Sequence, residues 1–187
     1  SACRASSSCS YSHFSRASAR SRRYAYILLE SPVRPSVEAG RVGWVFRPLN
    51  LDALRAGARY LLGEHDFSAF RASSCQALSP IKHLMRVDIE RRAAHPLSGP
   101  SSNGSAYWRF DFEANAFLHH MIRNLMGSLI QVGQGLRPPE WIAEVLASRS
   151  RDMAAPTFAA DGLYFLGPRY DAEWGLPDHT PAYDWLP

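Results

Sequence analysis

Two histidines and an arginine stand within five residues of one another in the segment NAFLHHMIRNLMGSLIQVG, residues 115–133. Histidine is a common zinc ligand, and helices that bind zinc use histidines four residues apart because these share one face. His119 and His120 are adjacent, so on a helix they would point about 100° apart. Neither has a second histidine or a carboxylate four residues away. The spacing argues against a metal site and predicts one histidine at the surface and the other hydrogen-bonded at the edge of an element.

Arg123 lies beside a broad apolar stripe, whose paired residues recur every four positions at 117/118, 121/122, 125/126 and 129/130. An arginine in this position either extends its head to solvent or, when nearly buried, pairs with a carboxylate or phosphate. No acidic residue stands in the same segment. Gly127, one turn later, costs about 1 kcal/mol relative to alanine in a helix interior, so we expect a packing reason or a close approach there. From these residues alone, the structural and the functional interpretation of Arg123 both stay open.

The elements that must position these side chains can be predicted from periodicity and from turn residues. We expect helices over 51–63, with Asn50 as N-cap, over 115–133 and over 137–148, and a compact loop or short helical turn over 64–80, in which Asp66 caps the turn. We expect strands over 22–30, 43–50, 81–91, 107–114 and a last, buried one over 161–170. In the strand 81–91, strict alternation places Ile81, His83, Met85, Val87 and Ile89 on one face. Because strands and helices are interspersed without βα alternation, the predicted class is α+β, an antiparallel sheet with helices packed on one face.

Composition sets the broad class of the protein. The chain has 187 residues, of which 46% are hydrophobic and 12% aromatic, enough for an ordinary globular core. No window approaches 18 continuous apolar residues, so we expect no membrane span. The three cysteines form no CxxC pair, which fits a reducing cytoplasm and neither a disulfide scaffold nor a zinc ribbon. We predict a disordered serine-rich lead-in over 1–12, one domain over 13–177 with an exposed hairpin loop over 92–106, and an irregular tail over 178–187.

Four arginines cluster around the start of the first predicted strand, at Arg16, Arg20, Arg22 and Arg23. Such a run is most often a solvated face or an edge that binds anions, and nucleic-acid phosphates are a common target. Tyr24 follows the run directly. A strand tyrosine is mostly a core residue, but beside a phosphate-binding edge its ring can also stack on an unpaired RNA base.

Four elements together resemble the TruA-type tRNA pseudouridine synthases: RRYAY (22–26), GEHDFSAF (63–70), NAFLHHMIRNLMGSLIQVG (115–133) and DGLYF (161–165), in this order. The resemblance covers roughly residues 13–177 and implies the pseudouridine synthase fold, in its C-terminal half. It also implies a cofactor-free, cytoplasmic, homodimeric isomerase that converts uridine to pseudouridine in the anticodon arm of tRNA, a reaction that requires the base to leave the stack.

The resemblance also implies roles for individual residues. Tyr24 is similar to the active-site tyrosine that stacks on the target base and is a candidate for proton transfer. Arg123 is similar to the arginine that pairs with the catalytic aspartate and holds it ionised. Leu163 is similar to the apolar residue that lines the pocket floor, although TFAADGL (157–163) departs from the proline that the family commonly has there. Arg16, Arg20, Arg22 and Arg23 fall where an RNA-facing edge is expected.

One departure from the family is central. The family's nucleophilic aspartate stands in a G-R-T-D-x-G-V-H motif well before the RRY segment, and no such motif occurs in this chain. We therefore expect the chain to correspond to the C-terminal portion of the enzyme, without its N-terminal domain, and to be inactive in isolation. A non-catalytic RNA-binding or partner-binding module derived from the enzyme is the main alternative, and a histidine-dependent metal hydrolase is a distant third.

Overall fold

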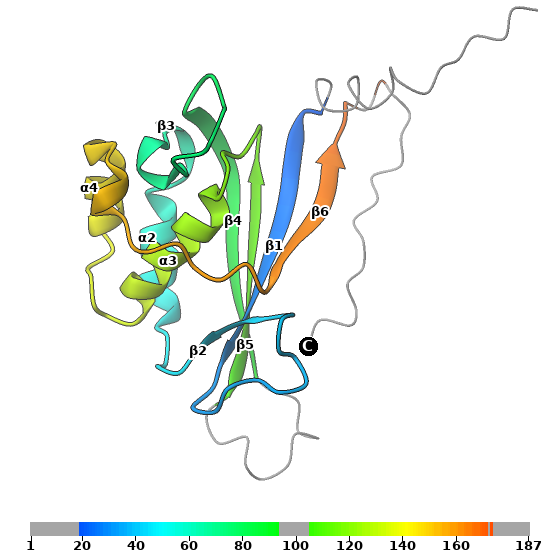
Figure 1. The fold of residues 1–187 in the computed structure, drawn as a ribbon, viewed down its shortest axis with the longest axis vertical. Helices are drawn as coiled ribbons and strands as arrows, with labels where there is room; N and C mark the ends of the chain where they lie inside the picture. The colour runs from blue at the N-terminus through cyan, green and yellow to red at the C-terminus, as the bar shows by residue number, and fades with distance from the viewer. Residues whose placement is uncertain (1–18, 94–104, 172, 174–187) are drawn as a thin grey trace, which may run out of the picture.

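The computed structural model of the chain describes residues 19–93, 105–171 and 173. Its centre is a six-stranded sheet in the order β2-β1-β5-β4-β3, with β6 paired to β1 as well (Figure 1). The pairs are antiparallel except for β1 with β2, which is parallel. The strands are β1 (Ser21–Glu30), β2 (Gly43–Val45), β3 (Gly63–Asp66), β4 (Ile81–Ala93), β5 (Ala106–Ala114) and β6 (Leu163–Arg169), and the helices are α2 (Leu51–Arg59), α3 (Met121–Gly133) and α4 (Trp141–Ser148), with short 3₁₀ turns η1 (Ser68–Phe70) and η2 (Arg151–Met153).

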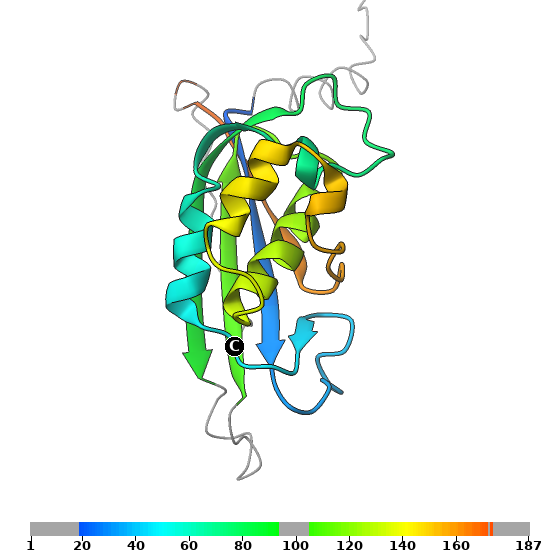
Figure 2. The ribbon, with the colours of Figure 1, turned by 90° about the vertical axis from the view of Figure 1, so that its left-hand side faces the viewer.

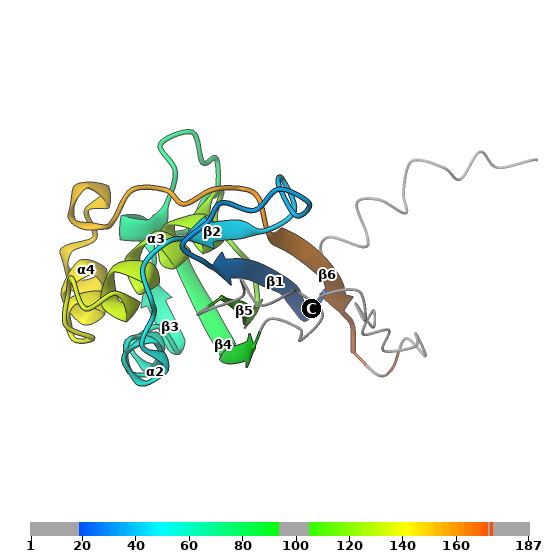
Figure 3. The ribbon, with the colours of Figure 1, turned by 90° about the horizontal axis from the view of Figure 1, so that it is seen from below.

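Helices α2, α3 and α4 lie on one face of the sheet (Figures 2 and 3). The core between the two layers contains large buried side chains from the strands and the helices, among them Trp108, Phe110, Phe112, Met121 and Leu125. Burying these aromatic and aliphatic surfaces is the main source of stability of such a layered domain. The predicted α+β class, with helices packed on one face of an antiparallel sheet, is confirmed. Within the described residues, no helix combines the length and the apolar character that crossing a membrane requires.

Strand β1 pairs along one edge with β5 and along the other with both β6 and β2. Its side chains alternate between the two faces of the sheet, and the two faces have different neighbours. Tyr26 and Leu28 lie in the main core under the helices, and Tyr24 packs against that core while half-buried. Ile27 and Leu29 point to the opposite face, where they form a small second cluster with Val42. Tyr24, Tyr26 and Leu28 therefore share one face of β1.

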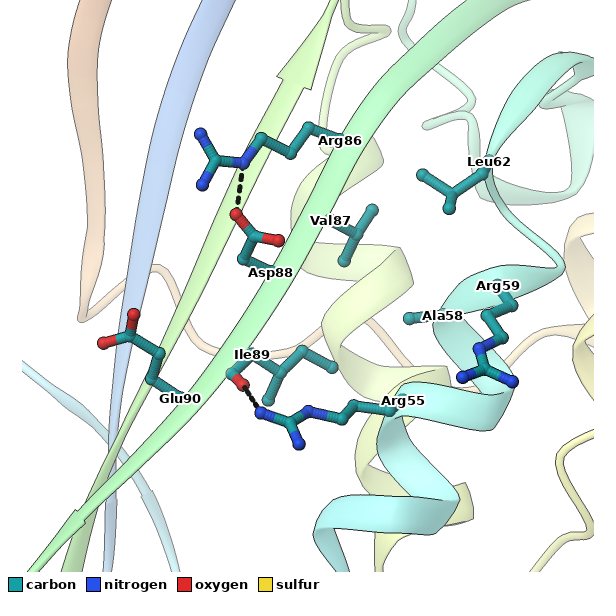
Figure 4. A pocket seen from close by; sticks show the side chains of 9 residues that line it. All are labelled: Arg55, Ala58, Arg59, Leu62, Arg86, Val87, Asp88, Ile89 and Glu90. Carbon is teal, nitrogen blue, oxygen red and sulfur yellow. Dashed lines mark hydrogen bonds and ion pairs between the residues drawn. The ribbon is translucent and has the colours of Figure 1, made fainter.

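The predicted alternation along β4 holds only for Val87 and Ile89 and is wrong for Ile81, His83 and Met85, which do not share their face. The register with β5 shifts between Leu84 and Arg86, so Met85 is an extra residue and the strand changes phase there. Leu84 is fully buried, whereas Met85 is 42% exposed. Beyond the bulge, Val87 and Ile89 point toward α2 while Arg86, Asp88 and Glu90 point away from it (Figure 4). The antiparallel pairing of β4 with β5, which the predicted hairpin loop implies, is confirmed.

Helix α2 begins where the sequence predicts, because the Asn50 side chain accepts a hydrogen bond of 2.9 Å from the backbone N–H of Ala53. The helix ends at Arg59 and not at Gly63, and Leu62, which the predicted helix 51–63 included, is 41% exposed. The following residues 63–66 form β3, a strand missed in the expected loop 64–80. Asp66 does accept hydrogen bonds at η1, from the Ser68 N–H at 2.9 Å and the Ser68 hydroxyl at 2.6 Å, although Phe67 holds the N-cap position.

Helix α3 starts at Met121, six residues later than predicted. His120 stands at its N-cap with φ +60°, in the left-handed region, so residues 115–120 approach the helix as irregular chain. Helix α4 covers the last eight of the twelve residues predicted as helix over 137–148. Strand β6 is only partly buried, with Phe165 51% exposed, so its predicted burial is wrong. The expected lead-in 1–12, the tail 178–187 and most of the hairpin loop 92–106 lie outside the described residues.

Candidate active site

Tyr24 is the centre of an aromatic cluster at the start of β1. Its ring lies 5.2 Å from that of Phe117 in an edge-to-face arrangement and 4.9 Å from that of Phe165, tilted by 47°. Phe165 is brought there because it pairs with Tyr24 across β1 and β6, and Phe117 because it stands between β5 and α3. Burial raises the pKa of Tyr24, although the nearby Arg22 charge opposes the shift. The phenol therefore stays protonated near neutral pH and can donate a hydrogen bond.

Leu163 is the first residue of β6 and pairs with Tyr26 on β1, two residues from Tyr24. It packs, half-buried, against the main core. Its position depends on Gly162, which has φ +93° and whose carbonyl accepts a 2.8 Å hydrogen bond from the Ile27 N–H. A Cβ at position 162 would lie 2.2 Å from the Ile27 carbonyl oxygen, so only glycine allows this approach. Leu163 thus enters the same side of the sheet as Tyr24.

Arg123 lies in the first turn of α3 and is half-buried. Its Nε donates a 2.8 Å hydrogen bond to the carbonyl of Phe158, and its own backbone carbonyl accepts a 3.1 Å bond from the Phe158 N–H. Among the described residues, no carboxylate lies within 4.0 Å of the guanidinium. The two terminal nitrogens keep a planar fork that suits bidentate binding of a carboxylate.

Tyr26, next but one to Tyr24 in β1, links the aromatic cluster around Tyr24 to the surroundings of Arg123. Its ring lies 5.9 Å from that of Phe158, and its hydroxyl donates a 3.0 Å hydrogen bond to the carbonyl of Ala159. Burial strongly raises the pKa of Tyr26, the charge of Asp161 raises it further, and the charge of Arg123 lowers it. The three candidate residues Tyr24, Arg123 and Leu163 are therefore gathered around β1 and the segment that leads into β6, without direct contact between Tyr24 and Arg123.

Three of the four clustered arginines lie in the described residues, and they do not share one face. Arg16 lies outside the described residues. Arg20 is exposed and forms an ion pair of 3.4 Å with Asp171, and Arg22, on the Tyr24 face, donates to the Asn115 carbonyl at 2.9 Å. Arg23 points to the opposite face and is only 7% exposed. The assignment of these arginines to RNA binding stays a prediction, with Arg22 on the face that carries Tyr24.

The two histidines lie next to each other before α3, with ring centroids 4.0 Å apart. His119 is exposed, and its Nδ1 lies 3.2 Å from the Ser74 hydroxyl. Burial lowers the pKa of His120, and the charges of His119 and Arg123 lower it further. Across the described part of the chain, no group of three or more histidine, cysteine or acidic side chains is placed to hold a metal ion.

Sequence reasoning missed the aromatic neighbours of Tyr24 and the residues around Phe158. Phe165 could have been found from its parity, because Leu163 and Phe165 share a face of one strand. Phe117 and Phe158 gave no such signal, since their positions depend on contacts between segments distant in the sequence.

A separate hollow of about 480 Å³ lies between α2 and β4, away from these residues (Figure 4). Arg55 there donates a 3.1 Å hydrogen bond to the Ile89 carbonyl, on the side of β4 that β5 does not pair with. This contact covers part of an open strand edge, which is a common protection against unwanted pairing.

Comparison with known proteins gives consistent results. The family model described as tRNA pseudouridine synthase matches residues 58–171, more than half of the chain. The chain is 67% identical over 173 residues to a tRNA pseudouridine synthase A of Polaromonas naphthalenivorans, covering 92% of this chain and 62% of the relative. It is 64% identical over 179 residues to the protein of that name from Paracidovorax citrulli, covering 92% and 64%.

The matches cover only part of the relatives and only part of this chain. The chain spans less than two thirds of the length of these relatives. Tyr24 stands ahead of the residues that the family model matches, whereas Arg123 and Leu163 lie within them. On the family match and on the identity of the relatives, this chain belongs to the tRNA pseudouridine synthase family, as a TruA-type sequence.

Proposed function

We propose that the protein containing this chain isomerises uridine to pseudouridine in the anticodon arm of tRNA, and that the chain supplies the tyrosine and the arginine of the active site. The observation that carries the proposal is the state of Arg123. Its Nε is fixed to the Phe158 carbonyl, while no described carboxylate pairs with its terminal nitrogens. A guanidinium held in this way is prepared for a carboxylate that comes from elsewhere.

In this proposal the carboxylate is an aspartate outside the 187 residues, because the chain has no G-R-T-D motif. Arg123 would keep that carboxylate ionised and fix its angle, so that it can attack the ribose or the uracil. The bond between ribose C1′ and uracil N1 breaks, the detached ring turns, and C1′ bonds to C5. The C5 proton leaves to solvent, N1 takes up a proton and ends as N–H, and the bond that the carboxylate formed in its attack is broken again, so the net change is an isomerisation. Arg123 itself neither gives nor takes a proton in these steps, since guanidinium stays charged.

Tyr24 would orient the detached base. Its ring, with the exposed Phe165 beside it, offers an aromatic surface on which uracil can stack, and base stacking of this kind is insensitive to sequence. The raised pKa of Tyr24 keeps its hydroxyl protonated, so it would act as a hydrogen-bond donor or an acid and not as a resting base. Leu163 would give the ring an apolar neighbour, and Arg20 and Arg22 would contact phosphates next to the extruded nucleotide.

The partners follow from the same proposal. We infer that the substrate is tRNA, that the active protein is a cytoplasmic homodimer, and that no cofactor takes part. The alternative is a module that binds RNA or a protein partner without catalysis, and it rests on the lack of a G-R-T-D motif in these 187 residues.

Deletion of the encoding gene tests the two functions against each other. If the protein is the enzyme, tRNA from the deletion strain loses pseudouridine in the anticodon arm, and the wild-type gene restores it. Mass spectrometry of digested tRNA measures this. Unchanged tRNA in the deletion strain, together with no G-R-T-D motif in the reading frame, would leave only the non-catalytic module.

A further inference from the structure

The segment 154–162 between η2 and β6, called the strap, runs along α3 with a matched series of contacts. The Ala155 N–H donates to the Ser128 hydroxyl at 3.3 Å. The carbonyl of Pro156 lies so close to Gly127 that a Cβ there would be 2.2 Å from its oxygen. Phe158 exchanges two hydrogen bonds with Arg123. The strap is therefore fixed to the helix over its first half, before it crosses to β1.

The side chains of Asn124, Arg151 and Thr157, called the triad, form further hydrogen bonds between α3 and the strap. Thr157 donates its hydroxyl to the Asn124 side-chain carbonyl at 2.7 Å, and Arg151 Nη2 donates both to that oxygen at 3.2 Å and to the Thr157 hydroxyl at 3.1 Å. Asn124 is fully buried, and its amide nitrogen donates to the Phe70 carbonyl at 2.8 Å. The side chains of Asn124 and Thr157 and both terminal nitrogens of Arg151 thus take part in one hydrogen-bond network, which restrains the three residues relative to one another.

Two residues of the triad are sequence neighbours of the two residues that form the Arg123–Phe158 hydrogen bond. Asn124 follows Arg123 in α3, and Thr157 precedes Phe158 in the strap. A bond between Asn124 and Thr157 therefore fixes the spacing of helix and strap at the residues beside the one carbonyl that holds the Arg123 Nε. Arg151 adds a second fixation, because its Nη1 donates to the strap carbonyls of Ala154 at 3.3 Å and Ala155 at 2.9 Å.

We propose that Asn124, Thr157 and Arg151 are positioning residues for catalysis: they hold the Phe158 carbonyl where it orients the Arg123 guanidinium. This inference rests on the proposed function, since it concerns the arginine that would bind the catalytic carboxylate. Small displacements of a charged partner reduce turnover much more than substrate binding, because the geometry matters most in the transition state.

Two substitutions at one position test the proposal. Thr157→Val removes the hydroxyl but keeps the shape, whereas Thr157→Ser keeps the hydroxyl. In the full reading frame that contains this chain, we expect Thr157→Val to lower kcat about three- to tenfold, the effect of one lost hydrogen bond, with KM for tRNA within about twofold. Thr157→Ser should stay close to wild type. Equal kcat in all three proteins, or equal losses in both variants, would overturn the proposal.

A second measurement needs no enzymatic activity. In the 187-residue chain, hydrogen exchange at the amide of Phe158 should become about tenfold faster in Thr157→Val and stay unchanged in Thr157→Ser, with the α2 amides as internal reference. Unchanged exchange at Phe158 in Thr157→Val would refute the network itself. An inactive full-length wild type, with the expected exchange, would instead refute the proposed function.

Discussion

Gly127 offers the sharpest test of how the strap is held. A Cβ at this position would lie 2.2 Å from the Pro156 carbonyl oxygen, whereas a relaxed contact between carbon and oxygen needs roughly 3.3 Å. In Gly127→Ala the strap must therefore move by about 1 Å, and the obstacle is backbone, which cannot rotate aside as a side chain can. The hydrogen bonds of Ala155 and Phe158 to α3 would then be lengthened or lost.

The expected magnitude follows from opposing contributions. Three weakened hydrogen bonds cost about 0.5–1.5 kcal/mol each, and alanine in place of glycine in a helix gains about 1 kcal/mol. The net loss is about 2 kcal/mol in the free energy of unfolding, which for a domain of this size lowers Tm by about 4–8 °C. Thermal unfolding of the chain followed by circular dichroism measures this.

Gly57 in α2 is a matched control. A Cβ there would meet its nearest neighbour, Val132 Cγ1, at 3.4 Å, which is an ordinary contact. Gly57→Ala should therefore be neutral or raise the stability by up to about 1 kcal/mol. The same substitution in two helices is expected to have opposite signs. A stabilised Gly127→Ala variant would refute the close contact between α3 and the strap.

Three further predictions concern the site and the fold. In the full-length protein, Arg123→Ala should lower kcat by a factor of about 100 or more while the Kd for tRNA changes less than about threefold. The reason is that the substitution disturbs the catalytic carboxylate and not the contacts with tRNA phosphates. Equal losses of kcat in a kinetic assay and of affinity in a filter-binding assay would indicate that Arg123 contacts RNA instead. Asn50→Ala should cost about 1 kcal/mol in urea unfolding through loss of the α2 cap, and an effect near zero would contradict the capping bond. The Ser68 hydrogen bonds are the largest influence that lowers the pKa of Asp66. The Asp66 carboxylate therefore stabilises the fold above its unfolded pKa, and this stabilisation is lost as pH falls below about 4. Asp66→Asn should flatten the fall in the free energy of unfolding at acid pH, and an unchanged pH profile would contradict this.

The features that sequence reasoning predicted correctly depend on local chemistry. Asn50 caps α2 because its side chain reaches an N–H three residues away, and Gly127 signalled a close approach because glycine is unfavourable inside a helix. The roles that the resemblance implies for Tyr24, Arg123 and Leu163 stay predictions.

The features that were missed depend on distant parts of the chain. The bulge at Met85 is set by the register with β5, which alternation within one strand cannot reveal. The start of α3 is delayed because His120 adopts a left-handed conformation, which local helix propensity does not predict. The partner of Arg123 within the chain is a backbone carbonyl 35 residues away, and carbonyl positions leave no trace in residue type.

The central claim is that this chain carries the tyrosine and arginine of a tRNA pseudouridine synthase while the carboxylate comes from outside it. Release of tritium from unmodified tRNA labelled at uracil C5 tests this directly, because pseudouridine formation removes the hydrogen at C5. The account predicts release by the product of the full reading frame and none above background by the 187 residues alone at equal concentration. Appreciable release by the chain alone, or none by the full product, would contradict it.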